Sequence, residues 1–315
     1  MITKLKLNNK IIINTDIDGI ISGLLLSNFC DCIVVGFSNS LDKVWLDISK
    51  CSSIFDGVYV DMYVPNETTI TIDQHIIAVN DKHFKMISQN RNKINPNIYN
   101  PRFFLPIDSY KRKYPFGTCH FIIATLLRES IDVSKINFFN LSDKIFFIDY
   151  FLRADDAMIS SLSNYKENAK EWWEWLSIYS NKSKTIESIK NYLYSKNIDL
   201  AMEIKKSISN KLLNTFYCDR QDGGITNIID DKGTIKQNVK EYIHFISSLS
   251  NLNCFDINLS LKEFKGLNKR TCLTEYQREE LIQNNSVNGE KVFSYAFVKT
   301  AKYGENFSYT VMDNK

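Results

Sequence analysis

The stretch that most constrains this chain is Asn14–Gly19 (NTDIDG), which follows the apolar run Ile11–Ile13. The run predicts a short buried strand that ends in two carboxylates, Asp16 and Asp18, before Gly19 lets the chain turn into a helix. Open α/β sheets bind their ligands at the carboxyl ends of their strands. We therefore expect both acids at a ligand-binding edge, where carboxylate oxygens suit hard divalent cations.

Length and composition narrow the class of protein. A chain of 315 residues predicts two domains, and its 44% hydrophobic and 24% charged residues are typical of a soluble globular protein. The net charge of +3 neither requires nor excludes an anionic partner. Seven scattered cysteines without a CxxC pair favour a reducing compartment. With no secretory signal and no apolar run of about 18 residues, we expect a cytoplasmic protein that does not contact membranes.

Strands and helices alternate in the first half of the chain. The expected strands are Ile11–Asn14, Cys32–Phe37, Val58–Asp61 and Thr69–Asp73, and the expected helices are Gly19–Phe29, one that begins at Gly117, and about Leu141–Ser163. This alternation predicts an α/β fold, with a mainly parallel sheet covered by helices on both faces.

The rest of the chain predicts a helical connector and a smaller α+β domain. Lys166–Phe216 has a helical pattern with breaks near Asn181 and Asn197, and its tryptophans Trp172, Trp173 and Trp175 favour packing over a membrane or nucleic-acid surface. Beyond it we expect strands at Ile225–Ile229 and Cys254–Leu261, a helix at Ile235–Leu249, and a hairpin of Val292–Val298 with Phe307–Met312. The expected units are residues 1–164, 165–216 and 217–315.

Acids recur at the ends of the predicted elements. Asp61 and Asp73 end two further strands, His75 follows closely, and Asp149 lies in a later helix. Carboxylates a few ångströms apart repel one another, so a cluster of them requires cations. Two divalent ions would neutralise the cluster and favour in-line attack on phosphorus. Taken singly, each aspartate is equally typical of a helix cap or a turn, and this alternative is strongest for Asp18.

Five motifs occur in order within about residues 8–160: NTDIDGIIS, VYVDMYVP, TIDQH, PFGTCHFIIATLL and FFIDYFLRADD. Their order and spacing resemble the DHH phosphoesterase superfamily, which includes RecJ-type single-strand exonucleases, nano-RNases, cyclic dinucleotide phosphodiesterases and manganese pyrophosphatases. The resemblance implies a hydrolase that uses Mn²⁺ or Mg²⁺ to cleave phosphodiester bonds of nucleotides or short single-stranded nucleic acid.

The resemblance also implies roles for individual residues. The implied catalytic set is Asp16, Asp18, Asp61, Asp73, His75 and Asp149, of which Asp16, Asp18, Asp61 and Asp149 would hold the metal and His75 would contact substrate. Gly117 and Thr118 resemble a small-residue turn near the substrate phosphate. The basic residues Arg153, Lys265, Lys269 and Arg270 are further candidates for phosphate contacts, although exposed cations are more often simply solvated.

The chain departs from the family pattern at three places. The histidine before the first acid is absent, Gln74 replaces the middle histidine of the triplet, and neither Asp222–Gly224 nor Tyr303-Gly304 is followed by the histidine of a glycine-rich substrate loop. Fewer imidazoles favour a harder ion, a single ion or impaired catalysis. A degenerate relative that binds a nucleotide or a protein without hydrolysis is thus an alternative, and a haloacid-dehalogenase-type phosphatase with Asp16 as nucleophile is a minor one. An oligomer is compatible with the sequence.

Overall fold

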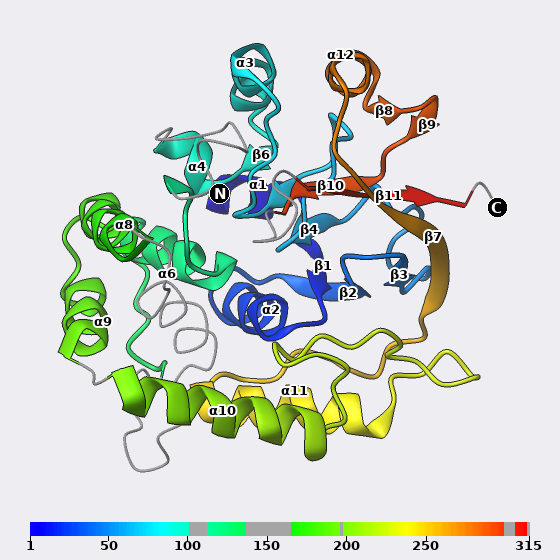
Figure 1. Ribbon diagram of the computed structural model, residues 1–315. Helices are drawn as coiled ribbons and strands as arrows, with labels where there is room; N and C mark the ends of the chain where they lie inside the picture. Colours follow the sequence, from blue (N-terminus) through cyan, green and yellow to red (C-terminus); the bar gives the residue numbers. More distant parts are fainter. Residues whose placement is uncertain (101–111, 137–164, 196–197, 299–305, 314–315) are drawn as a thin grey trace.

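The computed structural model describes residues 1–100, 112–136, 165–195, 198–298 and 306–313, which fold into a mixed α/β structure (Figure 1). One nine-stranded sheet has the order β10-β11-β7-β3-β2-β1-β4-β5-β6. Its strands are β1 (Lys10–Asn14), β2 (Ile33–Ser38), β3 (Lys43–Leu46), β4 (Val58–Val60), β5 (Thr71–Ile72), β6 (Lys93–Ile94), β7 (Lys262–Thr271), β10 (Ser294–Phe297) and β11 (Phe307–Met312). A separate small ribbon pairs β8 (Ser286–Val287) with β9 (Glu290–Lys291).

Strand β1 lies inside the parallel part of the sheet. It pairs in parallel with β2 and β4, and the parallel pairing continues from β4 to β5 and from β5 to β6. The side chains of Ile11–Ile13 are fully buried, as expected for a strand covered on both faces. The predicted parallel arrangement is confirmed for this part of the sheet, and it brings the carboxyl ends of β1, β4 and β5 to one edge. The pairings of β2 with β3, β3 with β7, β7 with β11 and β11 with β10 are antiparallel, so the whole sheet is mixed.

Helix α2 (Ile17–Phe29) packs on β1, β2 and β4, with Leu24–Leu26 fully shielded from solvent. It packs against α6 (Thr118–Arg128) and α11 (Gln237–Ser250), which come from distant parts of the sequence. The remaining described helices are α1 (Ile2–Leu7), α3 (Asp81–Gln89), α4 (Pro96–Tyr99), α8 (Tyr165–Tyr179), α9 (Lys184–Ser195), α10 (Ile198–Asn214) and α12 (Glu275–Asn284). Figure 1 shows α10 and α11 together at one end of the molecule and α3 and α12 at the other.

The sheet continues across the predicted domain boundary at residue 217. Strand β7 pairs antiparallel with β3 on one side and with β11 on the other, so the predicted C-terminal hairpin of β10 and β11 extends the N-terminal sheet. The sequence pattern did not indicate β3 or β7. The boundaries at 164 and 216 stay predictions.

Two predicted strands are wrong. The ranges Ile225–Ile229 and Cys254–Leu261 contribute only isolated bridges, Ile229 to Ile235 and Ser260 to Thr234. The apolar residues of the second range, Phe255, Ile257, Leu259 and Leu261, all join the core, but apart from the bridge at Ser260 this range has no regular secondary structure. The alternation of apolar and polar residues in this range therefore reflects packing against the core and not pairing in a sheet.

The helical connector packs as expected. Trp172 and Trp173 are fully buried, and the Trp172 Nε1–H donates to the Arg112 carbonyl at 2.9 Å. The predicted break near Asn181 separates α8 from α9, whereas Asn197 and the expected helix at residues 141–163 lie outside the described residues. All seven cysteines are free thiols. In the described ranges, no helix has the length and apolar character needed to cross a bilayer.

His83 gives the fold a measurable pH dependence. The side chain is buried in α3, its Nδ1 accepts a hydrogen bond from the Val79 backbone N–H at 3.3 Å, and burial lowers its pKa to about 4. Because the unfolded-state pKa is about 6.5, the neutral ring stabilises the fold above that pH, and this contribution is lost as the pH falls through the folded-state value. Urea unfolding should show that the stability of the wild type relative to His83→Gln falls by about 3 kcal/mol between neutral pH and about pH 4.

The matched control is His244→Gln, which changes an exposed histidine of α11. Its stability relative to the wild type should change far less over the same pH range. A difference between the wild type and His83→Gln that is independent of pH would contradict the assignment of His83 as a buried neutral ring.

Candidate metal site

The edge formed by β4 and β5 carries the acids that the sequence predicted there. Asp61 directly follows β4 and Asp73 directly follows β5. Both residues are buried, with exposed fractions of 3% for Asp61 and 1% for Asp73. Asp61 adopts φ of +62°, a left-handed conformation that aspartate tolerates better than most residues. Potential ligand atoms of Asp61, Asp73 and His75 all lie within 4.8 Å of one another, which makes this group a candidate cation site.

His75 is oriented by its neighbours. Its Nδ1 lies 2.6 Å from Asp73 Oδ1, and its backbone N–H donates to Asp73 Oδ2 at 3.1 Å. Asn95 Nδ2 donates to the His75 carbonyl at 2.9 Å. A carboxylate on one ring nitrogen fixes the ring and its tautomer, so Nε2 becomes the atom available for chemistry. Gln74, which stands at the middle of the triplet, places its Nε2 3.4 Å from this atom.

Asn14 connects the acids of two strands. Its Nδ2 donates to Asp16 Oδ2 and to Asp61 Oδ2, both at 3.1 Å, while its Oδ1 accepts the Thr15 backbone N–H at 2.8 Å. The backbone contact fixes the orientation of the amide, because the oxygen is already used and the nitrogen must face the carboxylates. Asp16 also caps α2 through the Gly19 N–H at 3.0 Å. A Cβ on Gly19 would lie 2.2 Å from the Asn14 carbonyl oxygen, so this approach requires glycine.

Asp18 lies in the first turn of α2 but caps a different helix. Its Oδ2 accepts the Thr118 N–H at 2.6 Å and its Oδ1 accepts the Cys119 N–H at 2.9 Å, at the start of α6. The helix N-terminus favours negative charge, and these donors occupy both carboxylate oxygens of a side chain that is 1% exposed. The geometry therefore gives Asp18 a structural role between α2 and α6.

The predicted phosphate turn also contacts the acids. Thr118 Oγ1 donates to Asp61 Oδ1 at 2.8 Å, and the Gly117 N–H donates to His120 Nδ1 at 3.1 Å. These contacts order the carboxylate of Asp61 and the start of α6. The structure thus brings Gly117 and Thr118 to the acid cluster, with their donors directed at protein atoms.

A loop from the second half of the chain docks on the opening turn. Thr15 Oγ1 donates to the Ile225 carbonyl at 3.1 Å, and the Ile17 N–H donates to the Asp222 carbonyl at 3.0 Å. This docking brings Arg220 Nη2 to 3.8 Å from Asp16 Oδ2. The Asp222-Gly223-Gly224 turn is visible in the sequence, but nothing in it indicated that Arg220 would reach the acids, and this is the main residue that sequence reasoning missed.

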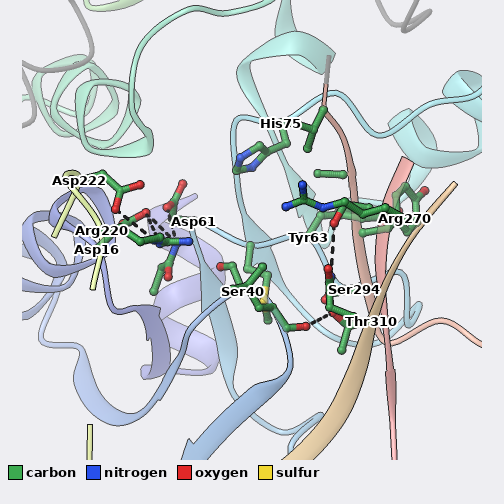
Figure 2. Close-up of a pocket in the computed structure, with 18 residues that line it drawn as sticks. Asp16, Ser40, Asp61, Tyr63, His75, Arg220, Asp222, Arg270, Ser294 and Thr310 are labelled. Atoms are coloured by element: carbon green, nitrogen blue, oxygen red, sulfur yellow. Dashed lines mark hydrogen bonds and ion pairs between the residues drawn. The ribbon is translucent and has the colours of Figure 1, made fainter. Parts of the chain in front are cut away.

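A pocket of about 300 Å³ lies between the acids and the C-terminal hairpin. Figure 2 shows Asp16 and Asp61 on one side of the pocket, Arg270, Ser294 and Thr310 on the other, and His75 at the top between them. The pocket is lined by Asn14, Asp16, Ser40, Leu41, Asp61, Met62, Tyr63, His75, Arg220, Asp222, Asn268, Arg270, Ser294, Tyr295, Ala296, Val298, Ser308 and Thr310. It therefore combines a carboxylate–imidazole wall with a polar wall that carries a guanidinium.

The predicted basic residues separate into two groups. Arg270 lines the pocket, whereas Lys269, the next residue of β7, forms an ion pair with Glu290 outside it, as expected for side chains that alternate across a strand. Lys265 pairs with Glu263 at 3.3 Å and is also absent from the pocket lining. Asp149 and Arg153 lie outside the described residues.

Comparisons with family models, with curated proteins and with solved structures found no match to this chain. The resemblance noted in the sequence therefore rests on the motifs themselves.

The structural role of Asp18 predicts a loss of stability. Asp18→Ala leaves the Thr118 and Cys119 N–H groups buried without their acceptor, which should lower the free energy of unfolding in a chelating buffer by about 3 kcal/mol. Asp132→Ala is the matched control, because Asp132 accepts hydrogen bonds from Ser134 in an exposed turn and its loss should lower the stability far less. Unchanged stability of Asp18→Ala in chelator, measured by urea unfolding, would argue for a ligand role instead.

Proposed function

We propose that this protein is a metal-dependent phosphoesterase of the DHH type, which hydrolyses phosphodiester bonds of nucleotides or short single-stranded nucleic acid. The observation that carries the proposal is the cluster of Asp61, Asp73 and His75 at a parallel-strand edge, of which Asp61 and His75 line the same pocket as Arg270. An anionic phosphate would meet a guanidinium on one wall and a cation site on the other.

The donor set fits a divalent cation. Asp61 and Asp73 are buried carboxylates, and His75 adds an imidazole at the mouth of the cluster. Mixed oxygen and nitrogen ligands suit Mn²⁺, while the predominance of oxygen also suits Mg²⁺. These three residues would hold the ion, which when bound supplies a Lewis acid for phosphoryl oxygen and an activated water.

The protein residues around the ion have distinct tasks. Asp73 holds the Nδ1 side of His75, so that Nε2 is the ring atom that would face the ion. Asn14 and Thr118 fix the two oxygens of Asp61 by hydrogen bonds. Arg270 would bind the phosphate and orient it relative to the acids.

The same contacts favour a second candidate function, which is binding of a nucleotide or a protein without hydrolysis. Both carboxylate oxygens of Asp61 already accept hydrogen bonds from the protein, and Gln74 supplies an amide where the family has an imidazole. A site whose ligands are satisfied in this way can bind an anion while holding a metal weakly.

Hydrolysis of bis(p-nitrophenyl) phosphate with added Mn²⁺ tests the proposed activity. Asp61→Asn should lower kcat/KM by about 100-fold or more, because it removes a charged ligand that contributes several kcal/mol to the cation site. The matched control is Asp256→Asn, which changes an exposed aspartate that pairs with Lys50 and should leave the rate unchanged.

Equal rates for the wild type and Asp61→Asn would contradict phosphoesterase activity at this site. Nucleotide binding that persists in chelator, with no turnover in any divalent metal, would establish the binding function in its place. Calorimetry with nucleoside monophosphates supplies that measurement.

Arg270, on the pocket wall that faces the acids, gives a separate prediction. Arg270→Met should raise KM about tenfold or more with a smaller change in kcat, because a hydrogen bond between charged groups is worth about 1.5–3 kcal/mol. Lys269→Met is the matched control, since it removes the same charge from the adjacent residue on the other side of β7. Similar effects of the two variants would contradict a specific role for Arg270.

A further inference from the structure

We infer that this site is built for one divalent ion, with Asn14 and Arg220 placed as permanent protein groups beside Asp16, where a second ion would otherwise bind. The inference rests on the proposed function, because it assumes that Asp61, Asp73 and His75 hold the first ion. The position of the second ion would be on the side of Asp61 that faces Asp16 and the docked loop.

The first observation is the amide between the two carboxylates. Asn14 Nδ2 donates to Asp16 Oδ2 and Asp61 Oδ2, both at 3.1 Å. An ion bridging these same oxygens would have to displace the amide group. The amide cannot turn its oxygen towards such an ion without losing the 2.8 Å bond from the Thr15 N–H. Asn14 therefore satisfies both carboxylates and excludes a bridging cation.

The second observation is a fixed positive charge at the same oxygen. Arg220 Nη2 lies 3.8 Å from Asp16 Oδ2, and its Nε donates to Asp222 Oδ1 at 3.2 Å. The guanidinium lies directly over Gly224, where a Cβ would be only 2.1 Å from Arg220 Nε. The glycine and the aspartate thus hold Arg220 in place, and its charge repels a second dication.

The third observation is that, among the described residues, the acids beside this position already have protein partners for their ligand atoms. Asp18 directs both oxygens to the N-terminus of α6, and Asp16 Oδ1 accepts the Gly19 N–H. Asp16 and Asp18, which the sequence assigned as metal ligands, are therefore used to cap helices. An arginine also supplies what a second ion would supply, namely positive charge and donors for a phosphate oxygen, and chelators cannot remove it.

Electron paramagnetic resonance of the full-length protein titrated with Mn²⁺ tests this inference without reference to activity. The wild type should bind one ion per chain and give the resolved hyperfine spectrum of isolated Mn²⁺. The double variant Asn14→Asp/Arg220→Leu replaces the amide with a ligand and removes the repelling charge. It should bind two ions per chain, with the broadened spectrum of an exchange-coupled pair bridged by Asp61.

The matched control is Asn227→Asp/Arg91→Leu, which makes the same changes at two exposed positions away from the pocket and should keep one ion. Two coupled ions in the wild type would overturn the inference while supporting the proposed function. No bound ion in the wild type would overturn both. A double variant that unfolds cooperatively on heating yet still binds one ion would also overturn the inference, and if that variant does not fold, the wild-type count decides alone.

Discussion

The structure depends on how it compensates carboxylates that are buried at one sheet edge. Asp16, Asp18, Asp61 and Asp73 are each at most 4% exposed, and a charge removed from water in this way requires partners. Helix N-termini provide them for Asp16 and Asp18, and side-chain donors provide them for Asp61 and Asp73. The packing of α2 against α6 and the docking of the loop at Arg220 follow from the same requirement.

The parallel edge was predictable because its signals are local. Three apolar strands each end in an acid, and the parallel pairing of β1, β4 and β5 is enough to bring Asp61, Asp73 and His75 together. Each of these acids follows an apolar run of only a few residues, and that run is enough to predict the strand end at which the acid lies. The fold class followed from the same alternation of strands and helices.

The rest of the site depends on long-range contacts that no periodicity encodes. Arg220 reaches Asp16 through hydrogen bonds of Thr15 and Ile17 to a loop about two hundred positions away, and β7 carries Arg270 to the pocket only because it pairs with β3. The role of Asp18 shows a subtler limit. A cap was the expected alternative for this residue, but the helix that it caps is α6, which begins at Thr118.

The continuity of the sheet has a consequence for the width of the pocket. The hairpin is hydrogen-bonded to the rest of the sheet through β7, and it is tied again where the Phe297 N–H donates to the Ile76 carbonyl and the Tyr295 hydroxyl donates to the Ile77 carbonyl. The two walls of the pocket thus belong to one continuous hydrogen-bonded sheet. The distance between them is therefore set by the pairing of strands within that sheet, and not by a hinge between separate lobes.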